Sequence, residues 1–390
     1  MYAPLASGLE PPAFLVMPAY RLIQHHDARS FVDQADRWND LWRRSEVAAP
    51  SARAEQIAHW LATFAADETF YALTVNDGER LVAALPLVGR RVKQLMRVGM
   101  LPHNEWTSGG ELLVDPTADV AAALDCLCEG IADVPWPLLW LDEIALGAPY
   151  WQAFRAALER AGISFEATRL ASTAQVTIAH DWQAYEATRD GDHRRSRRRY
   201  AKKLQQAGKL DFIVHAPRDP SEAEQLARIA FEIEDRSWKG AAGSSVIKAG
   251  LLDAFARQAA LAANSGHVEF AFLHLDDRPI AFAYFWRSKG VVFIVKLGYD
   301  ESFRQFGPGQ QLVMHVLERL HGERDCRLLD FWGRLAPWNE SWATHTYDVS
   351  RLVVAPPRLV SRGLLKAYAS LCDLKAPERE PTPPPVVIAE

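Results

Sequence analysis

An order of elements that occurs twice is the feature that most constrains this chain. In each half the sequence predicts a hairpin of two apolar strands, then a loop, a helix and a further apolar strand. The hairpins are Tyr71 to Val88, with an Asn-Asp-Gly turn, and Phe270 to Trp286. The strands after the helices are Leu138 to Asp142 and Leu328 to Phe331. We therefore expect two domains of one type, with two unrelated mixed halves as the alternative.

A length of 390 residues suits two domains of ordinary size. We expect an α/β (α+β) fold of tandem domains, each a mixed, largely antiparallel sheet flanked by helices. The expected boundaries are an N-terminal arm over 1–18, a first domain over 19–180, a second domain over 181–355, a C-terminal helix over 356–376 and a Pro-rich tail over 377–390.

Local patterns predict the remaining elements. A capping box at Ser221 to Glu224 predicts the start of one helix. Other helices are expected near 29–45, 51–65, 117–131, 149–161, 194–206, 249–264, 309–321 and 359–372, and other strands near 164–178, 291–297 and 343–354.

Composition narrows the class of protein. The net charge is −5 and the pI is about 6.2, so nothing global indicates a nucleic-acid or membrane partner. No apolar run approaches the ~20 residues that span a bilayer, and the N-terminus lacks the basic region of a signal peptide. The four cysteines lack the spacing of a zinc site. These observations predict a cytoplasmic protein without a metal.

A segment rich in glycine follows the strand that begins at Val291. Glycines let the backbone pass close to a bulky anion, and a helix N-terminus offers free N–H groups and a partial positive charge. Arg304 can add a direct charge contact, whereas Pro308 cannot donate. The expected pyrophosphate donors are the amides of Gly307, Gly309, Gln310 and Gln311.

This order of elements resembles the GNAT acyltransferase superfamily. Its phosphate loop has the pattern Arg/Gln-x-x-Gly-x-Gly/Ala, which Arg304, Gly307 and Gly309 match. The resemblance implies acetyl-CoA or another acyl-CoA as co-substrate. It also implies that a main-chain N–H near Leu297 stabilises the oxyanion of the reaction.

Four motifs in order narrow the resemblance: Ser237-Trp238-Lys239-Gly240, Gly298-Tyr299-Asp300, Gly307-Pro308-Gly309 and Asp330-Phe331-Trp332-Gly333. Together they resemble the acetyltransferase domain of CelD-like proteins of bacterial exopolysaccharide synthesis. These are related to the Fem-type aminoacyl transferases, which pair two GNAT-like domains. The resemblance covers about 180–350 and, more weakly, the first half. Relatives usually carry Tyr-Lys where this chain has Trp338-Asn339, so that lysine has no counterpart here.

The first half lacks the phosphate loop. Its counterpart runs from Glu105 to Gly110, with no leading arginine and with adjacent glycines. One acyl-CoA site is therefore expected, in the second half, while the first half supplies a wall of the acceptor site. The candidate acceptor-binding residues are His103, Asn104, Glu105, Trp238 and Trp338.

The resemblance implies direct attack of the acceptor on the thioester, which needs an oxyanion donor and a general base. Asp330 ends an apolar strand, where a cleft can raise its pKa, and a structural cap is the alternative. Asp235 at a helix end and His345 on an alternating strand are further base candidates, with a solvated face and a half-buried histidine as alternatives. Tyr299 and Tyr347 are candidate donors to the leaving thiolate, with packing roles as the alternative.

The basic run from Arg194 to Lys203 places Arg195, Arg198, Arg199 and Lys202 on one helical face. CoA phosphates, an acidic glycan, a carrier protein and RNA are possible partners, and a solvated face is the alternative.

Three functions follow from these observations. The first is transfer of an acyl group from acyl-CoA to an amine or hydroxyl, with an exopolysaccharide or cell-envelope sugar as the acceptor that the resemblance suggests. The second is a Fem-type transferase that uses charged tRNA. The third is a degenerate GNAT-like binding module.

Overall fold

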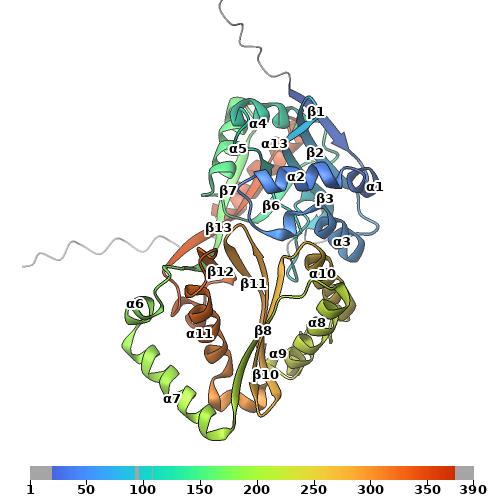
Figure 1. Cartoon of the computed structure of the whole chain (residues 1–390). Helices are drawn as coiled ribbons and strands as arrows, with labels where there is room; N and C mark the ends of the chain where they lie inside the picture. The colour runs from blue at the N-terminus through green and yellow to red at the C-terminus, as the bar shows by residue number, and fades with distance from the viewer. Residues whose placement is uncertain (1–19, 93–95, 108, 374–390) are drawn as a thin grey trace, which may run out of the picture.

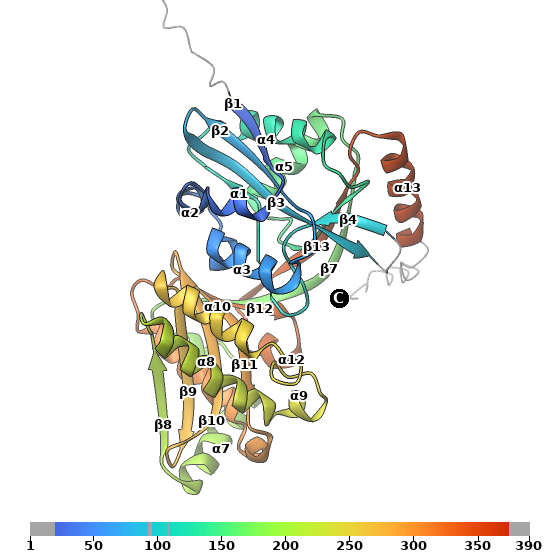
Figure 2. The same ribbon diagram turned by 90° about the vertical axis from the view of Figure 1, so that its right-hand side faces the viewer.

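The computed structural model describes residues 20–92, 96–107 and 109–373. The expected N-terminal arm over 1–18 and the Pro-rich tail over 377–390 lie outside the described residues. Two lobes stand one above the other in Figures 1 and 2, and one continuous sheet runs through both. We call them the first half, which ends with β7, and the second half, which begins after it.

The strands of the first half are β1 (Tyr20–His25), β2 (Phe70–Asp77), β3 (Arg80–Val92), β4 (Met96–Met100), β5 (Leu113–Val114), β6 (Leu139–Ile144) and β7 (Phe165–Thr177). Those of the second half are β8 (Leu210–His215), β9 (Val268–Leu275), β10 (Arg278–Ser288), β11 (Val291–Tyr299), β12 (Leu328–Arg334) and β13 (His345–Val354).

The sheet is symmetric about its centre. Its order is β1-β2-β3-β4-β6-β13-β7-β12-β11-β10-β9-β8, with β5 beside β3. The two halves therefore repeat one order outward from the antiparallel pair β13 and β7. β13, the last strand among the described residues, pairs with β6 of the first half, and β7 pairs with β12 of the second half. The expected repeat is confirmed, and each half gives its last strand to the sheet of the other.

Helices cover both faces of this sheet in Figures 1 and 2. In the first half they are α1 (Ala28–Val32), α2 (Ala35–Arg44), η1 (Pro50–Ala52), α3 (Ala54–Phe64), α4 (Val120–Glu129), η2 (Gly130–Ala132) and α5 (Pro149–Arg160). In the second half they are α6 (Trp182–Ala187), α7 (Gly191–Ala207), α8 (Pro220–Asp235), α9 (Trp238–Ala241), α10 (Leu252–Asn264), η3 (Glu301–Phe306), α11 (Pro308–His321), α12 (Pro337–Glu340) and α13 (Leu359–Asp373). Within the described ranges, none of these helices has the length and apolar character needed to cross a bilayer.

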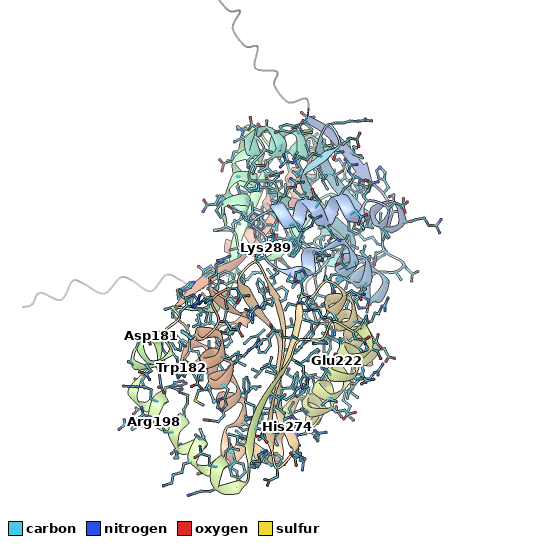
Figure 3. The ribbon with its side chains drawn as sticks, viewed as in Figure 1. Asp181, Trp182, Arg198, Glu222, His274 and Lys289 are labelled. Atoms are coloured by element: carbon cyan, nitrogen blue, oxygen red, sulfur yellow. The ribbon has the colours of Figure 1, made fainter. Side chains whose placement is uncertain are left out.

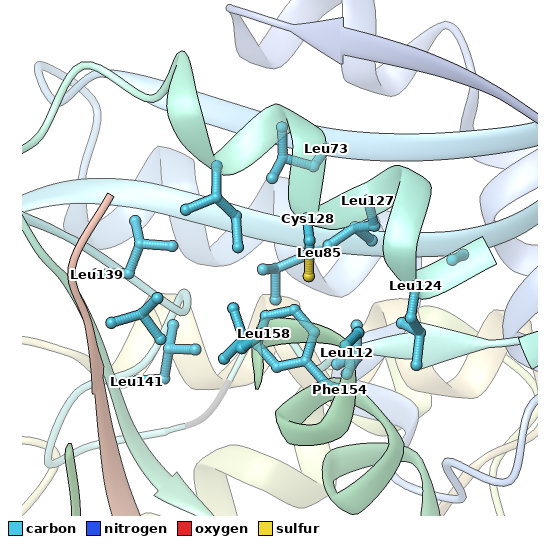
Figure 4. Packing of buried hydrophobic residues seen from close by; sticks show 14 of the residues in the cluster. Leu73, Leu85, Leu112, Leu124, Leu127, Cys128, Leu139, Leu141, Phe154 and Leu158 are labelled. Atoms are coloured by element: carbon cyan, nitrogen blue, oxygen red, sulfur yellow. The ribbon is translucent and has the colours of Figure 1, made fainter. Parts of the chain in front are cut away.

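Each half has one apolar core on either face of its sheet. Because both faces are covered, β2 and β9 are buried almost continuously rather than at alternate positions. Figure 4 shows one of these cores, where leucines of β2, β3 and β6 meet α4 and α5. Two-sided burial fixes the register of the central strands, because every side chain must meet a core.

Contacts between the halves also come from side chains. Lys289, on the turn between β10 and β11, donates from Nζ to the carbonyl oxygens of Trp42, Ser45 and Val47, the last two at 2.8 and 2.7 Å. Figure 3 shows Lys289 at the junction of the two lobes. In addition, Gln56 Nε2 of α3 donates to the carbonyl oxygen of Gln258 on α10 at 3.2 Å.

Several elements differ from the sequence prediction. The single helix expected over 29–45 is broken into α1 and α2. The helix expected at the capping box begins earlier, at Pro220, because the carboxylate of Asp219 accepts the Glu222 N–H at 2.9 Å. β1, β4, β8, α9 and α12 were not predicted, since they are short and weakly patterned.

Candidate active site

β11 and β12 run side by side only at their start. Their parallel pairing covers Val291 to Phe293 against Leu328 to Asp330 and ends there. Beyond this point β11 stays with β10, where the register shifts at Val295, and β12 stays with β7. The two strands therefore form a V whose apex lies between Phe293 and Asp330. The expected oxyanion donor near Leu297 lies on the open arm of β11 and stays a prediction.

The glycine loop joins this arm to α11. Gly307 has φ +58°, a left-handed conformation that favours glycine, and it begins α11 without a side-chain cap. A Cβ at Gly307 would lie 2.8 Å from the ring of Tyr200 on α7. A Cβ at Gly309 would lie 3.2 Å from the ring of Tyr299. Glycine is thus required at 307 by both backbone and packing, and the helix N-terminus carries no internal anion.

Not all the expected pyrophosphate donors are free. The Gly307 N–H donates to the Arg304 carbonyl at 3.0 Å, and the amides of Gln310 and Gln311 reach the Gly307 carbonyl at 3.1 and 3.2 Å. Among the four expected donors, only the Gly309 N–H lacks an acceptor in the described part of the chain. Three of the four amides thus already have main-chain acceptors in this conformation: the turn of η3 uses that of Gly307, and the first turn of α11 uses those of Gln310 and Gln311. Binding of a pyrophosphate by all four amides stays a prediction.

The side chains of the loop divide into two groups. Arg304 is 77% exposed, and its Nη1 lies 3.3 Å from Glu301. Gln311 is fully buried and donates from Nε2 to the Arg197 carbonyl at 2.9 Å, so it holds α7 against α11. Leu297 is half-buried and packs toward the α11 core, whereas Gln310 Nε2 donates to the Trp338 carbonyl at 3.4 Å. Arg304 is thus the side chain best placed to meet an anion.

The equivalent helix of the first half is closed to an anion. α4 begins at a carboxylate cap, Asp119, which accepts the Ala122 N–H at 3.1 Å. A carboxylate there already satisfies the helix dipole and repels a phosphate. The contrast with uncapped Gly307 supports one cofactor site, in the second half.

The counterpart loop of the first half instead contacts the second half. Gln258 Nε2 donates to Thr107 Oγ1 at 3.1 Å, and Trp106 packs with the core beside α8 and α10. The Nζ of Lys296 lies 5.4 Å from the Trp106 ring and 5.1 Å from the Phe255 ring. Burial lowers the pKa of Lys296 to about 8. This loop therefore covers the β11 arm from the side opposite α11.

A pocket of about 450 Å³ lies between the halves. Phe293 and Asp330, the last paired residues of β11 and β12, both line it, so the pocket reaches the apex of the V. Two non-glycine residues with positive φ also line it, Glu143 at 56° and Trp332 at 48°. They occupy equivalent bulges in β6 and β12, and such strained positions are concentrated at functional sites.

Asp330 is 3% exposed and accepts three hydrogen bonds. The donors are Gln175 Nε2 at 2.8 Å, the Trp332 N–H at 2.7 Å and the Tyr347 hydroxyl. Burial raises the pKa of Asp330, and these three donors oppose that rise. Asp330 lies inside β12 rather than at the end of the strand, and its lone pairs are largely occupied.

His345 belongs to the same network although it is exposed. Its Nε2 lies 2.8 Å from Gln175 Oε1, so Gln175 connects His345 to Asp330. Tyr347 faces the pocket, and burial raises its pKa well above 10. Tyr299 lies instead beside Gly309 in the glycine loop. The structure thus brings Asp330, His345 and Tyr347 together and separates Tyr299 from them.

Glu111 is a pocket residue that the sequence analysis missed. It follows the glycines of the first-half loop and lines the pocket. Its carboxylate accepts the Leu112 N–H at 2.9 Å. Burial raises its pKa from the ordinary 4.5 to about 7. A single Glu after a pair of glycines gives no periodic pattern that would predict a functional residue. The one available signal was its position in the first-half loop that corresponds to the glycine loop of the second half.

The three first-half acceptor candidates differ in role. His103 lines the pocket, and burial lowers its pKa. Asn104 Oδ1 accepts the N–H groups of Trp106 and Thr107, both at 3.0 Å, and thereby shapes the loop. Glu105 is exposed. Of the three, the structure places His103 at the candidate acceptor pocket.

The second-half acceptor candidates lie outside that pocket. Trp238 is 59% exposed at the start of α9. Trp338 is 41% exposed, and its ring meets Phe331 edge to face at 5.5 Å on the α11 side. Asp235, a candidate base, also lies outside the pocket, and its carboxylate accepts a hydrogen bond from Ser245 Oγ at 2.5 Å, which ties the end of α8 to the following loop. The pocket is therefore built without these three residues.

Asn339, which stands where relatives usually carry a lysine, has a structural role. It is 1% exposed, its Oδ1 accepts the Ala336 N–H at 2.8 Å, and its Nδ2 donates to the Arg334 carbonyl at 3.1 Å. The side chain thus closes the turn between β12 and α12.

The basic helix α7 has two faces. Arg197 is 2% exposed, pairs with Glu186 at 3.1 Å and stacks over Trp342 at 4.8 Å. Arg198 projects outward from the helix in Figure 3. The run is thus partly buried, where it packs against the start of α11, and partly a solvated cationic face.

Within the described ranges no group of three or more Asp, Glu, His and Cys side chains is arranged to hold a metal ion.

Comparisons with known proteins bear on this arrangement. Residues 191–340 match the family model of the acetyltransferase (GNAT) domain. The crystal structure of FemX superposes with a TM-score of 0.53 at 9% identity, over 85% of this chain and 96% of that one. A conserved protein of unknown function from Bacteroides thetaiotaomicron gives 0.50 at 12% identity, over 83% and 97%. No curated protein matches the chain.

At these identities the two structural likenesses show the fold, and the family model adds the assignment of the second half. The matched residues contain the V of β11 and β12 and the uncapped start of α11. Residues 191–340 are therefore a GNAT acetyltransferase domain, in a chain built from two GNAT-like halves.

Proposed function

We propose that this protein transfers an acetyl or longer acyl group from acyl-CoA to an amine or hydroxyl acceptor. The observation that carries the proposal is the junction at the V. The strands part at Phe293 and Asp330, which also line the pocket between the halves. A thioester held along β11 and an acceptor held in the pocket would meet at that point.

The residues of the loop fit an acyl-CoA. α11 offers a helix N-terminus without an internal anion, and no acceptor for the Gly309 N–H lies in the described part of the chain. The exposed Arg304 side chain supplies a positive charge. The acyl-CoA supplies the activated thioester. The protein holds its pyrophosphate at this loop, and a β11 amide near Leu297 stabilises the oxyanion.

On the acceptor side, the resemblance to CelD-like proteins suggests an exopolysaccharide or cell-envelope sugar. The cytoplasmic location stays a prediction. Tyr347 and Trp332 give the pocket aromatic surface, and its carboxylates can accept hydrogen bonds from hydroxyl or amino groups. These features support a sugar-like acceptor.

Thermal unfolding with acetyl-CoA or CoA tests the proposal. At about 100 times Kd, a ligand should add about 2.7 kcal/mol to the stability of the wild type. Gly309→Trp should abolish this shift, because its indole would occupy the space beside Tyr299 where the loop meets the V. Gly363→Trp is the matched control, since a Cβ there meets nothing within 4 Å on remote α13.

The alternatives give different results. No shift with any acyl-CoA would exclude the proposal. A shift without transfer to any acceptor would indicate a binding module. Salt-sensitive binding of tRNA with no response to acyl-CoA would indicate a Fem-type transferase. The exposed cations of α7 would then contact the tRNA phosphates.

A further inference from the structure

The pocket between the halves is acidic. Four carboxyl groups line it, those of Glu46, Glu111, Glu143 and Asp330. Arg334 is the basic side chain of the lining, and its Nη2 already lies 3.4 Å from Glu143. Burial lowers the pKa of His103, which favours its neutral form near pH 7. The site therefore favours a cation over an anion.

The carboxyl groups at the apex of the V are not equally available. Asp330 already accepts hydrogen bonds from a side-chain amide, a main-chain N–H and a hydroxyl. Glu111 accepts two, a main-chain N–H from its own neighbour, Leu112, and a side-chain hydrogen bond from Trp151. A carboxylate offers about four acceptor positions, so Glu111 keeps more of them for a bound molecule. A general base needs such an open position.

Glu111 also faces the reacting region. It lines the same pocket as Phe293 and Asp330, where β11 and β12 part. Its charge contributes to the raised pKa values of Tyr150 on α5 and Tyr347 on β13, so both hydroxyls lie within its electrostatic reach. Tyr347 in turn donates to Asp330. The Glu111 carboxyl of the first half thus stands across the pocket from the Asp330 network of the second.

We propose that the first half supplies the general base, Glu111, to an acceptor amine that enters the pocket as its ammonium cation. This inference rests on the proposed acyl transfer. The ammonium gives one proton to the Glu111 carboxylate, and the freed nitrogen attacks the thioester carbonyl carbon. When the C–S bond breaks, its electron pair leaves with sulfur. The nitrogen loses its second proton as the amide forms, and the thiolate gains a proton to leave as free CoA.

The environment suits this step. Burial raises the pKa of Glu111 to about 7, and a base is most effective when its pKa lies near the working pH. The first half, which lacks a cofactor loop, then contributes to the chemistry as well as to the wall of the site. An acceptor with only hydroxyl groups carries no positive charge, so the negative charge of the pocket would not favour its binding.

The experiment compares wild type, Glu111→Gln, Glu111→Asp and Glu159→Gln for release of CoA thiol from acetyl-CoA. Glucosamine and glucose form one matched amine and hydroxyl pair, and 1,5-diaminopentane and 1,5-pentanediol form a second. Glu159 is an exposed residue of α5 outside the pocket and serves as control. The pH dependence of kcat/KM is recorded from pH 5.5 to 9, and acetyl-CoA affinity is measured separately for each variant.

We expect the wild type to acylate an amine at least tenfold faster than its hydroxyl partner, with an acidic limb near pH 7. Glu111→Gln should lower kcat/KM by roughly 100-fold or more, remove that limb and leave acetyl-CoA affinity within twofold. Glu111→Asp should restore part of the rate, and Glu159→Gln should behave as wild type.

Some results would overturn the inference while sparing the proposed function. These are transfer that persists within fivefold in Glu111→Gln, an unchanged acidic limb, preference for the hydroxyl partners, and acetyl-CoA binding without transfer to either amine. Failure of the wild type to bind acetyl-CoA would instead remove the proposed function and this inference together.

Discussion

Glu111→Gln should make the folded protein more stable above pH 7 while it removes activity. Burial raises the pKa of Glu111 from 4.5 to about 7 in the folded chain, whereas the unfolded chain keeps the ordinary value. Between these values the folded state binds more protons than the unfolded state, so the wild type loses stability as the pH rises from 4.5 to 7. At about 1.4 kcal/mol per pKa unit, the loss is about 3 kcal/mol.

Glutamine has the same shape and can still accept the Leu112 N–H, but it carries no charge at any pH. The variant should therefore equal the wild type within ~1 kcal/mol near pH 5 and exceed it by about 3 kcal/mol at pH 8. Denaturant unfolding at pH 5, 6, 7 and 8, followed by tryptophan fluorescence, measures the difference. The reasoning would be refuted by a difference that is constant with pH, or by a wild type that is the more stable protein at pH 8.

Three further substitutions test the structure. Gly307→Ala should weaken acetyl-CoA binding about tenfold and destabilise the fold by roughly 1–3 kcal/mol, because its left-handed backbone and the Tyr200 ring leave no room for a methyl group; calorimetry and unfolding curves measure these effects. Lys289→Ala should lower the free energy of unfolding by roughly 2–4 kcal/mol, because three main-chain carbonyls at the junction of the halves lose their donor. A loss below about 1 kcal/mol in urea unfolding would contradict this role of Lys289. Arg197→Ala should destabilise the fold by about 3 kcal/mol by leaving Glu186 without its buried partner, whereas Arg198→Ala should stay within ~0.5 kcal/mol; equal midpoints for the two variants in thermal unfolding would contradict this division of α7.

Glu111 is expected to lower the stability of the fold in return for activity, and other residues of the pocket share this pattern. Glu143 and Trp332 occupy left-handed backbone positions at equivalent bulges, and Asp330 is a buried carboxyl. Each of these features lowers stability in isolation. Their concentration around one pocket at the junction of the halves is the pattern expected of a functional site rather than of a packing region.

The two halves show how one order of elements acquires two roles. Uncapped Gly307 at α11 leaves a helix N-terminus ready for a phosphate, whereas Asp119 closes the same position at α4. The first-half loop after β4 packs instead against Lys296 and α10 and carries Glu111 into the pocket. Under the proposed function, the second half would bind the acyl donor and the first half would shape the acceptor site.

Local patterns in the sequence determined the hairpins, the long helices, the glycine loop and the repeat of element order. These depend on hydrophobic periodicity and turn residues that lie within a short stretch of chain, so they can be read without a fold. The patterns also singled out Asp330 and Gly307, although Asp330 lies inside β12 rather than at its end. They did not distinguish the Ser221 capping box from the cap that is used, Asp219, because both have the right residue types.

The tertiary structure alone decided what crosses between the halves. Nothing in the local pattern of β7 or β13 states that each pairs with the sheet of the other half, since any apolar strand can pair with any free edge. Only that exchange, with the docking of the first-half loop, brings Glu111 to the same pocket as Asp330, more than 200 residues further along the chain. The availability of each carboxylate likewise depends on donors from distant strands. The sequence alone therefore could not identify Glu111 as a candidate base, because its place beside Asp330 depends on the sheet that joins the two halves.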